Sequence, residues 1–287
     1  MTGNYQIRTM TPAEVAQAVD WAAAEGWNPG LADTECFLSV DPGGFIGGWL
    51  DGRMISSISV INYDDAFSFL GFYIVEEPHR GNGYGYALWQ EAIKHAGGRL
   101  IGLDGVVAEQ DNYRRSGFEF AYNNIRYGGV PQALSDAHVP SGVTLVPLAG
   151  SSPDIATYDR RVFPAPREAF LDAWVSAKDH VARAVRAGDG GVLGYGVIRP
   201  CRTGFKIGPL FADDPAIARA LVTELIAATG TNGADVFLDV PEPHGSAVAM
   251  AKDLGLEPVF ETARMYTGPA PDIDMARIFG VTTFELG

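Results

Sequence analysis

The glycine-rich segment Arg80-Gly81-Asn82-Gly83-Tyr84-Gly85 constrains the fold of this 287-residue chain more than any other feature. Residues 67–75 before it are mostly aromatic and branched, which predicts a buried strand. Residues 84–96 after it place apolar side chains on one face, which predicts a helix. Glycines at such a junction expose backbone N–H groups at a helix N-terminus, where the helix dipole adds positive charge. The segment therefore predicts a site for phosphate oxygens, to which Arg80 adds a cation.

The spacing of these glycines narrows the choice of phosphate ligand. A dinucleotide-binding fingerprint needs two residues between its second and third glycines, and a nucleoside-triphosphate loop needs a following Lys-Ser or Lys-Thr. This segment has neither feature. It matches the pattern Arg/Gln-x-x-Gly-x-Gly/Ala, for which the ligand is the pyrophosphate of coenzyme A.

Two stretches together resemble the GNAT superfamily of acetyl-CoA-dependent N-acetyltransferases. Residues 69–88 look like the family's fourth strand, loop and following helix, and Tyr113-Arg114-Arg115-Ser116-Gly117-Phe118 looks like its later Tyr-x-x-x-Gly-Phe signature. The resemblance is clear over residues 5–127 and fainter over 143–267. It implies an α/β fold with a mixed sheet, present here as two tandem copies, and acetyl-CoA as cosubstrate.

The order of predicted elements supports a duplication. The first half reads as strand 5–10, helices 11–24 and 33–39, strands 44–50, 53–63 and 67–75, helix 84–96, strand 100–107, helix 112–116 and strand 118–127. The second half repeats this order, with strand 143–147, helical segments within 154–185, strands 192–199 and 206–210, helix 215–228, strand 236–240, helix 246–254 and strand 257–266. We therefore expect an N-terminal domain over 1–128, a linker over 129–142 and a C-terminal domain with its tail over 143–287. The apolar end of the tail, residues 278–286, is expected to pack as an added strand.

The second half departs from the family pattern at the counterparts of the glycine loop and of Tyr113. Its counterpart of the glycine loop, Leu210-Phe211-Ala212-Asp213-Asp214-Pro215, has no arginine and no glycine triplet, and its two carboxylates would repel a pyrophosphate. The counterpart of Tyr113 falls near Ala251. We therefore expect a degenerate domain that does not catalyse and that covers the acceptor site or braces the first domain.

Composition excludes several classes of partner. A formal net charge of −14 opposes binding to nucleic acid and to anionic membranes. No apolar run is long enough to span a bilayer, and the N-terminus lacks the pattern of a signal peptide. Cys36 and Cys201 lie far apart, as expected for two reduced thiols in a cytoplasmic protein, and the five histidines share no spacing, so no metal is predicted.

The resemblance also implies roles for individual residues. Backbone N–H groups of Ile74, Val75 and Glu76 are expected to face the thioester, and Tyr113 is expected to donate a hydrogen bond or proton to the leaving thiolate. The alternative for Tyr113 is a semi-buried aromatic that only packs. The cofactor-binding set is Ile74, Val75, Glu76, Arg80, Gly81, Asn82, Gly83, Tyr84, Gly85 and Tyr113.

The base that must deprotonate the amine is less well defined. The candidates are Asp64, Asp65, Tyr73, Glu76, Glu77, Asp104 and Glu109. Asp104 lies within an apolar run, where a carboxylate is costly unless it is paired or functional, and burial would raise its pKa. The alternatives are a satisfied structural aspartate and a water relay without a single base. Trp27, Tyr63 and Tyr73 are expected to contact the substrate, with the alternative for Trp27 that it is a core anchor at the end of the helix.

These patterns predict an N-acetyltransferase that moves an acetyl group directly from acetyl-CoA to a primary amine of a small molecule, acting as a monomer or homodimer. The alternative from another class is a non-catalytic CoA-binding sensor or scaffold. Acetylation of protein N-termini or lysines is less favoured, because the extra domain would crowd a protein substrate.

Overall fold

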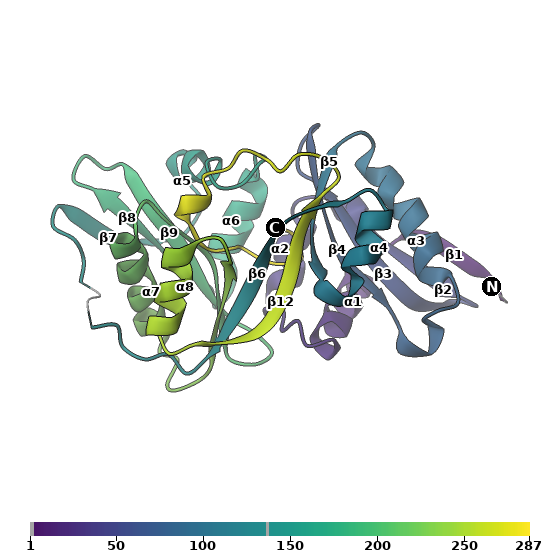
Figure 1. Ribbon diagram of the computed structural model, residues 1–287, viewed down its shortest axis with the longest axis horizontal. Helices are drawn as coiled ribbons and strands as arrows, with labels where there is room; N and C mark the ends of the chain where they lie inside the picture. The colour runs from purple at the N-terminus through teal and green to yellow at the C-terminus, as the bar shows by residue number, and fades with distance from the viewer. Residues whose placement is uncertain (1–2, 136–137) are drawn as a thin grey trace.

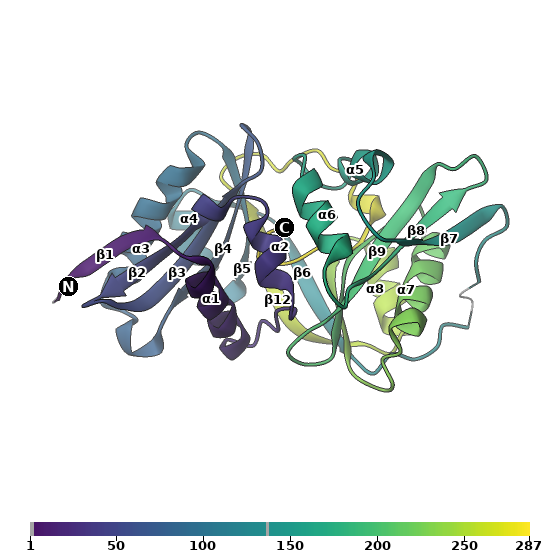
Figure 2. The same cartoon turned by 180° about the vertical axis from the view of Figure 1, so that it is seen from behind.

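The computed structural model describes residues 3–135 and 138–287, which form two lobes that share one continuous sheet (Figures 1 and 2). The strands are β1 (Tyr5–Thr9), β2 (Phe45–Leu50), β3 (Arg53–Asn62), β4 (Phe67–Val75), β5 (Leu100–Val106), β6 (Glu119–Gly129), β7 (Val143–Leu148), β8 (Val181–Ala187), β9 (Val192–Pro200), β10 (Phe205–Ala212), β11 (Val236–Pro241), β12 (Glu257–Tyr266) and β13 (Ile278–Gly280). The helices are α1 (Pro12–Ala24), α2 (Asp33–Leu38), α3 (Tyr84–Ala92), α4 (Gln110–Arg115), α5 (Pro153–Asp159), α6 (Glu168–Ser176), α7 (Pro215–Thr229) and α8 (Gly245–Asp253).

The element order confirms the predicted duplication. Each half runs as strand, two helices, three strands, helix, strand, helix and strand, followed in the second half by the short strand β13. The N-terminal signals also act as expected, because Thr11 and Glu14 form a reciprocal capping box at the start of α1. The fold class is thus a mixed α/β sheet in two copies.

One predicted element is wrong. Residues 177–185 were included in a helical stretch, whereas Val181–Ala187 form β8, which pairs with β7 on one side and β9 on the other. Alanine and arginine favour helices locally, but the pairing partners on both sides override that preference. The predicted helix over 84–96 is α3 followed by a short 3₁₀ turn over Ile93–Ala96.

The two halves exchange their sixth strands. The sheet order is β1-β2-β3-β4-β5-β12-β6-β11-β10-β9-β8-β7, so β12 of the second half lies beside β5 and β6 of the first half lies beside β11. Figure 1 shows β6 and β12 running together through the centre of the molecule. The predicted domain boundaries at 128 and 143 stay a prediction, but the two halves are joined by this exchange as well as by the connecting segment.

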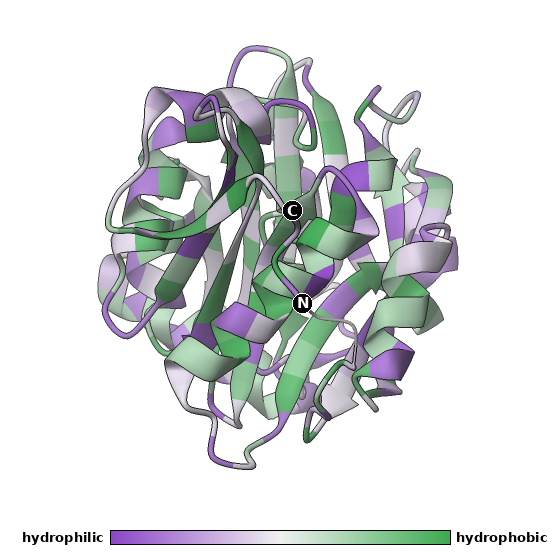
Figure 3. Ribbon diagram, turned by 90° about the vertical axis from the view of Figure 1, so that its left-hand side faces the viewer, coloured by the Kyte–Doolittle hydropathy of each residue, from purple (hydrophilic) through white to green (hydrophobic). Residues whose placement is uncertain are grey.

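Helices cover both faces of the sheet. Figure 2 shows α1, α2, α5 and α6 in front of it, and α3, α4, α7 and α8 lie on the opposite face seen in Figure 1. Apolar residues concentrate on the central strands, while polar residues gather on loops and outer helix faces (Figure 3). The core therefore lies between the sheet and its two helical layers.

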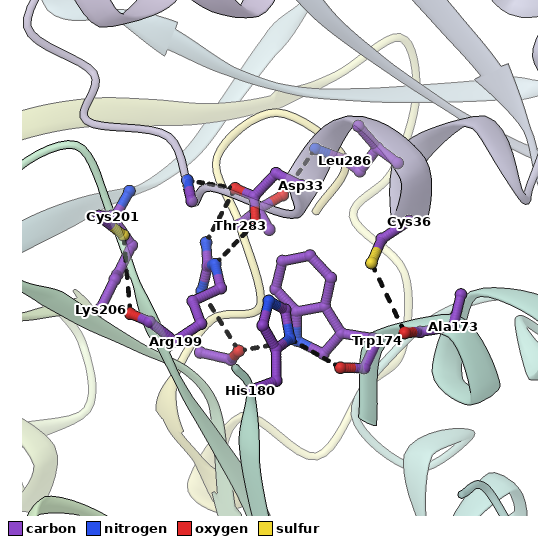
Figure 4. Close-up of polar contacts among 12 residues, drawn as sticks. Asp33, Cys36, Ala173, Trp174, His180, Arg199, Cys201, Lys206, Thr283 and Leu286 are labelled. Carbon is purple, nitrogen blue, oxygen red and sulfur yellow. Dashed lines mark hydrogen bonds and ion pairs between the residues drawn. The ribbon is translucent and has the colours of Figure 1, made fainter. Parts of the chain in front are cut away.

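Buried ion pairs fasten the lobes to each other. Asp33 at the start of α2 accepts from Arg199 of β9 at 2.9 Å, and both side chains are fully buried (Figure 4). The guanidinium of Arg199 also lies 4.4 Å from the ring centre of Trp174 in α6. A second buried pair joins Arg126 of β6 to Asp239 of β11 through two hydrogen bonds of 2.6 and 2.8 Å.

Candidate active site

A cavity of about 590 Å³ opens where β4 and β5 separate. These parallel strands pair only from Phe67 with Leu100 to Leu70 with Leu103, and the residues that follow on each strand line the cavity. A register shift between β3 and β4, with Phe72 in the left-handed region at φ +48°, marks the bend in β4 at this point. The bend leaves the continuation of β4 without β5 as a neighbour and so creates the gap.

The glycine loop forms one end of this cavity. Arg80, Gly81, Gly83 and Gly85 line it, and Gly83 is the N-cap of α3 with φ +84° and no side-chain cap. The first N–H groups of α3 therefore have no capping side chain, which is the arrangement that binds phosphate oxygens. These observations fit the pyrophosphate of coenzyme A at this end.

Arg80 organises the loop as well as supplying charge. Its Nε donates to the carbonyl of Val75 at 2.7 Å, and its guanidinium forms an ion pair with Glu25 of the segment after α1. Asn82 donates from Nδ2 to the carbonyls of His79 and Arg80, at 3.3 and 3.1 Å. Asn82 and Tyr84 do not line the cavity, so their predicted cofactor role is limited to shaping the loop and, for Tyr84, to its backbone.

The strand β4 presents fewer N–H groups to the cavity than the sequence indicated. Ile74 and Val75 line the cavity, but the N–H of Glu76 donates to the carbonyl of Ile55 in β3 at 2.9 Å. Because N–H groups alternate in direction along a strand, that of Val75 points away from β3 and toward the gap. The Glu76 side chain pairs with Arg53. The expected thioester contact therefore does not fit the N–H of Glu76, and for Val75 it stays a prediction.

Tyr113 lines the cavity from α4. Its side chain is only 8% exposed and packs on Trp89 of α3, with ring centres 5.9 Å apart. Gly105 of β5 passes so close that a Cβ there would lie 2.2 Å from the Tyr113 ring. Burial raises the pKa of Tyr113 well above its ordinary value, helped by the nearby Glu109, so the phenol keeps its proton at neutral pH.

Asp104 lines the same cavity but is committed to other groups. Arg264 of β12 donates to both of its oxygens, at 2.8 and 2.6 Å, and Asn124 of β6 donates to one of them at 2.8 Å. Both carboxylate oxygens are therefore already engaged by neighbouring side chains. The structure thus favours the alternative that Asp104 is a structural aspartate, which ties the exchanged strand β12 to β5.

The other predicted side chains separate into two groups. Trp27, Tyr73 and Glu109 line the cavity. Tyr63 does not line it. Its partly buried ring packs against Phe163 and its hydroxyl donates to the carbonyl of Leu286 at 2.8 Å, so we do not assign it a substrate contact. The remaining base candidates, Asp64, Asp65, Glu76 and Glu77, also lie outside the cavity lining.

The far end of the cavity comes from the second half, which sequence reasoning missed. Phe260 and Thr262 of β12, together with Phe284 and Glu285 of the C-terminal tail, line it. The exchange of strands and the return of the tail bring these residues to the first half from more than a hundred positions away. The available signal was Glu285 itself, the single charged residue in the apolar run 278–286.

The corresponding cleft in the second half is filled. There β10 pairs with β11 only from Phe205 with Val236 to Ile207 with Leu238, after which β13 becomes its partner through Leu210 and Gly280. Val281, directly after β13, donates its N–H to the carbonyl of Asp239 in β11 at 2.9 Å. The tail therefore occupies the gap between β10 and β11 that is equivalent to the cavity between β4 and β5.

The N-terminus of α7, which follows this second cleft, is also unsuited to bind a phosphate. Asp214 caps α7 by accepting from the N–H of Ile217 at 2.9 Å, where α3 has the bare Gly83. Asp213 is paired with Arg277 and accepts a hydrogen bond from the Tyr158 hydroxyl at 2.8 Å. Two carboxylates thus stand where the first half has Gly83, which provides no side-chain cap, and Arg80.

Comparison with known proteins agrees with this architecture. The acetyltransferase (GNAT) family model matches residues 11–118, and a model of an acetyltransferase (GNAT) domain matches residues 155–280. The holothin acyltransferase of Pseudoalteromonas sp. (strain SANK 73390) is 33% identical over 286 residues, which is 99% of this chain and 96% of that protein. This chain therefore belongs to the GNAT family, and it is a tandem-domain acyltransferase.

Two solved structures share the fold over nearly the whole chain. One is a Pyrococcus horikoshii protein classed among the acetyltransferases, with a TM-score of 0.81 at 22% identity, covering 100% of this chain and 97% of that one. The other is a tandem GNAT protein from the clavulanic acid biosynthesis pathway, with a TM-score of 0.61 at 14% identity, covering 93% and 100%. The family fold implies an acyl-CoA cosubstrate, for which the cavity at the glycine loop is the matching site.

Two further features limit the kinds of site in the described residues. Among residues 3–135 and 138–287, no three His, Cys, Asp or Glu side chains are grouped so that they could hold a metal ion. None of the helices in the same part of the chain has both the length and the apolar character needed to cross a membrane.

Proposed function

We propose that this acyltransferase moves an acetyl group from acetyl-CoA directly to a primary amine of a small molecule. The observation that carries the proposal is the single cavity that joins the glycine loop to the aromatic wall formed by Trp27, Phe260 and Phe284. Its volume of about 590 Å³ lies within the range typical of small-molecule sites. Acetyl is the proposed acyl group because both matching family models are of acetyltransferases.

Direct transfer is supported by the positions of the two cysteines. Cys36 and Cys201 are buried, and neither lines the cavity. Burial raises the pKa of the Cys36 thiol to about 12, with a smaller contribution from the nearby Asp33. A thiol held in this form, away from the cavity, is not suited to carry the acyl group as a thioester.

The second domain contributes a wall of the acceptor site and no acyl-CoA site of its own. The support is the pair of differences between the clefts, with β13 in the gap beside β10 and Asp214 at the N-terminus of α7. The likeness to holothin acyltransferase makes holothin the first acceptor to test, alongside a panel of small primary amines.

The loop assignment is tested by Gly83→Val. Gly83 has φ +84° with open space around its Cα, so the substitution costs about 1–2 kcal/mol of backbone strain and reshapes the first turn of α3. We expect the affinity for acetyl-CoA, measured by calorimetry, to fall at least about tenfold.

A matched control separates strain from site chemistry. Gly52, in the hairpin turn between β2 and β3, has φ +85° and equally open surroundings, but does not line the cavity. Gly52→Val should destabilise the fold by a similar amount and leave acetyl-CoA affinity unchanged. Equal affinity in the wild type and in Gly83→Val would refute the assignment of the loop. Tight acetyl-CoA binding without acylation of any amine would favour a sensor.

A further inference from the structure

Glu285, one of the residues that line the cavity, is a buried carboxylate without a hydrogen-bond partner among the described residues. The residue is 2% exposed, and both carboxylate oxygens lack a hydrogen-bond partner within the described parts of the chain. Glu285 and the neighbouring Phe284 both belong to the cavity wall, and the carboxylate oxygens lie within that wall. Because buried polar groups are normally satisfied, an unpartnered carboxylate in a ligand cavity indicates that the ligand supplies the partner.

The tail fixes this carboxylate firmly in place. On its C-terminal side, the carbonyl of Leu286 accepts from Tyr63. The N–H of Leu286 donates to the Thr283 hydroxyl at 2.9 Å (Figure 4). The Glu285 carbonyl lies against Gly71 of β4, where a Cβ would approach it to 2.2 Å. Glu285 is therefore held directly over the bend of β4, next to the strand that carries Val75.

The charges around Glu285 come from four other elements. Lys206 of β10, Arg126 of β6 and Arg199 of β9 favour its ionised form, while Asp33 of α2 opposes it. Each of the three cations already has a partner elsewhere: the carbonyl of Trp27 for Lys206, Asp239 for Arg126 and Asp33 for Arg199. Burial outweighs the attraction of these cations and raises the pKa of Glu285 above its ordinary 4.5.

We propose that Glu285 binds the ammonium group of the acceptor and removes its proton, acting as the general base of the reaction. This inference rests on the proposed acetyl transfer to an amine. Glu285 takes one proton from the ammonium, which frees the nitrogen lone pair to bond to the acyl carbon as the carbon–sulfur bond breaks. Tyr113 protonates the departing sulfur and recovers a proton from the new amide nitrogen, while Glu285 releases its proton to solvent.

A second unpartnered group adds to the acceptor end. The Thr262 hydroxyl is buried, lines the cavity and has no hydrogen-bond partner among the residues that the structure describes. A hydroxyl beside a carboxylate suits a cation that carries several N–H donors, such as a primary ammonium. Both groups belong to the second half, whereas the glycine loop and Tyr113 belong to the first.

The proposal predicts a specific defect in Glu285→Gln, which keeps the side-chain shape and removes the base. For an alkyl amine, which is protonated at pH 7–8, kcat should fall about 100-fold or more. For a weakly basic aromatic amine, already neutral at that pH, the loss should be several-fold at most. Glu285→Asp should retain an intermediate rate, and acetyl-CoA affinity should stay unchanged in both variants. The matched control is Glu261→Gln, an exposed carboxylate on β12 that does not line the cavity.

The pH profile gives a second readout. Only the ionised carboxylate accepts a proton, so kcat of the wild type should rise with pH through the pKa of Glu285, at a pH above 4.5. Glu285→Gln should lack this rising limb. If Glu285 had a purely structural role, Glu285→Gln would change the melting temperature. It would not alter the rise of kcat with pH, and it would affect both classes of amine equally.

The outcomes separate this inference from the proposed function. If the wild type acetylates amines and Glu285→Gln matches its kcat for alkyl amines at every pH, Glu285 is not the base and the proposed function still holds. An equal loss with both classes of amine would also overturn the base assignment. If the wild type acetylates no amine, the proposed function fails first.

Discussion

Tyr113 and Glu285 line one cavity from different halves of the chain, and the proposed reaction requires opposite proton transfers of them. Burial raises the pKa of both groups. For the phenol this preserves the proton that a leaving thiolate needs, and for the carboxylate it strengthens a base. In the proposed reaction, burial would thus prepare an acid on the thioester side and a base on the acceptor side.

Tyr113→Phe tests the acid half of this arrangement. The substitution keeps the packing on Trp89 and removes the hydroxyl, so we expect kcat to fall about 100-fold or more with little change in acetyl-CoA affinity. The loss should shrink with an acyl donor whose leaving thiol is more acidic, since that thiolate needs less help. Because the raised pKa keeps the phenol protonated, the wild type should show no Tyr113-dependent loss of rate between pH 7 and 9. Wild-type turnover in the variant would exclude the role.

Single residues also show what the motifs could indicate. Arg80, Gly81, Gly83, Gly85 and Tyr113 all line the cavity, and their predicted contacts with acyl-CoA stay a prediction. Asp104 could not be resolved from sequence, because its partner Arg264 lies 160 positions away. The Glu76 prediction failed for a local reason, since the direction of each N–H depends on the register of β4 against β3, which the motif does not reveal.

At the scale of elements, β13 distinguishes the two copies of the fold. The predicted added strand over 278–286 is real but shorter, because only Ile278–Gly280 pair with β10, and the rest of the run continues as the tail that ends beside Tyr63. One segment therefore fills the second cleft and then supplies Phe284 and Glu285 to the first. The apolar pattern of residues 278–286 predicted that the segment is buried. It could not predict that the segment contacts both clefts.

The filled cleft predicts one acetyl-CoA per chain. The loop before α7 carries Asp213 and the capping Asp214, whereas the corresponding helix α3 begins at Gly83 without a side-chain cap. In addition, β13 covers the edge of β10 that a pantetheine arm would follow. Calorimetric titration should give a stoichiometry of one, and Gly83→Val should weaken that single event. A second binding event that survives in Gly83→Val would show that the second cleft opens.

The whole molecule is held as one unit by interactions that cross between the lobes. Asp33 and Arg199 are fully buried, and the loop before α2 adds reciprocal hydrogen bonds of 2.9 Å between Asn28 and Thr203. This loop carries Trp27, so the same contacts that brace the lobes position one wall of the cavity. Sequence reasoning expected the second domain either to brace the first or to cover its acceptor site. The ion pair and hydrogen bonds brace the first half, and the covering of an acceptor site stays a prediction.

Asp33→Ala should be strongly destabilising. It leaves the Arg199 guanidinium buried without its carboxylate, which costs about 3–5 kcal/mol in the free energy of unfolding. The matched control is Asp20→Ala, which breaks the exposed pair with Arg202 between the same two lobes and should cost at most about 1 kcal/mol. Urea unfolding followed by circular dichroism measures both. Similar losses in the two variants would show that the buried pair does not hold the lobes together.

The exchanged strands also determine the order in which parts of the sheet can pair during synthesis of the chain. β5 leaves the ribosome long before its neighbour β12, because the paired residues Asp104 and Arg264 are separated by 160 positions. At about 5–20 residues per second, on the order of 10–30 s pass before that edge can be covered. During this interval β5 has an unpaired edge. Phe260 and Phe284 can complete the cavity only after most of the second half has been synthesised.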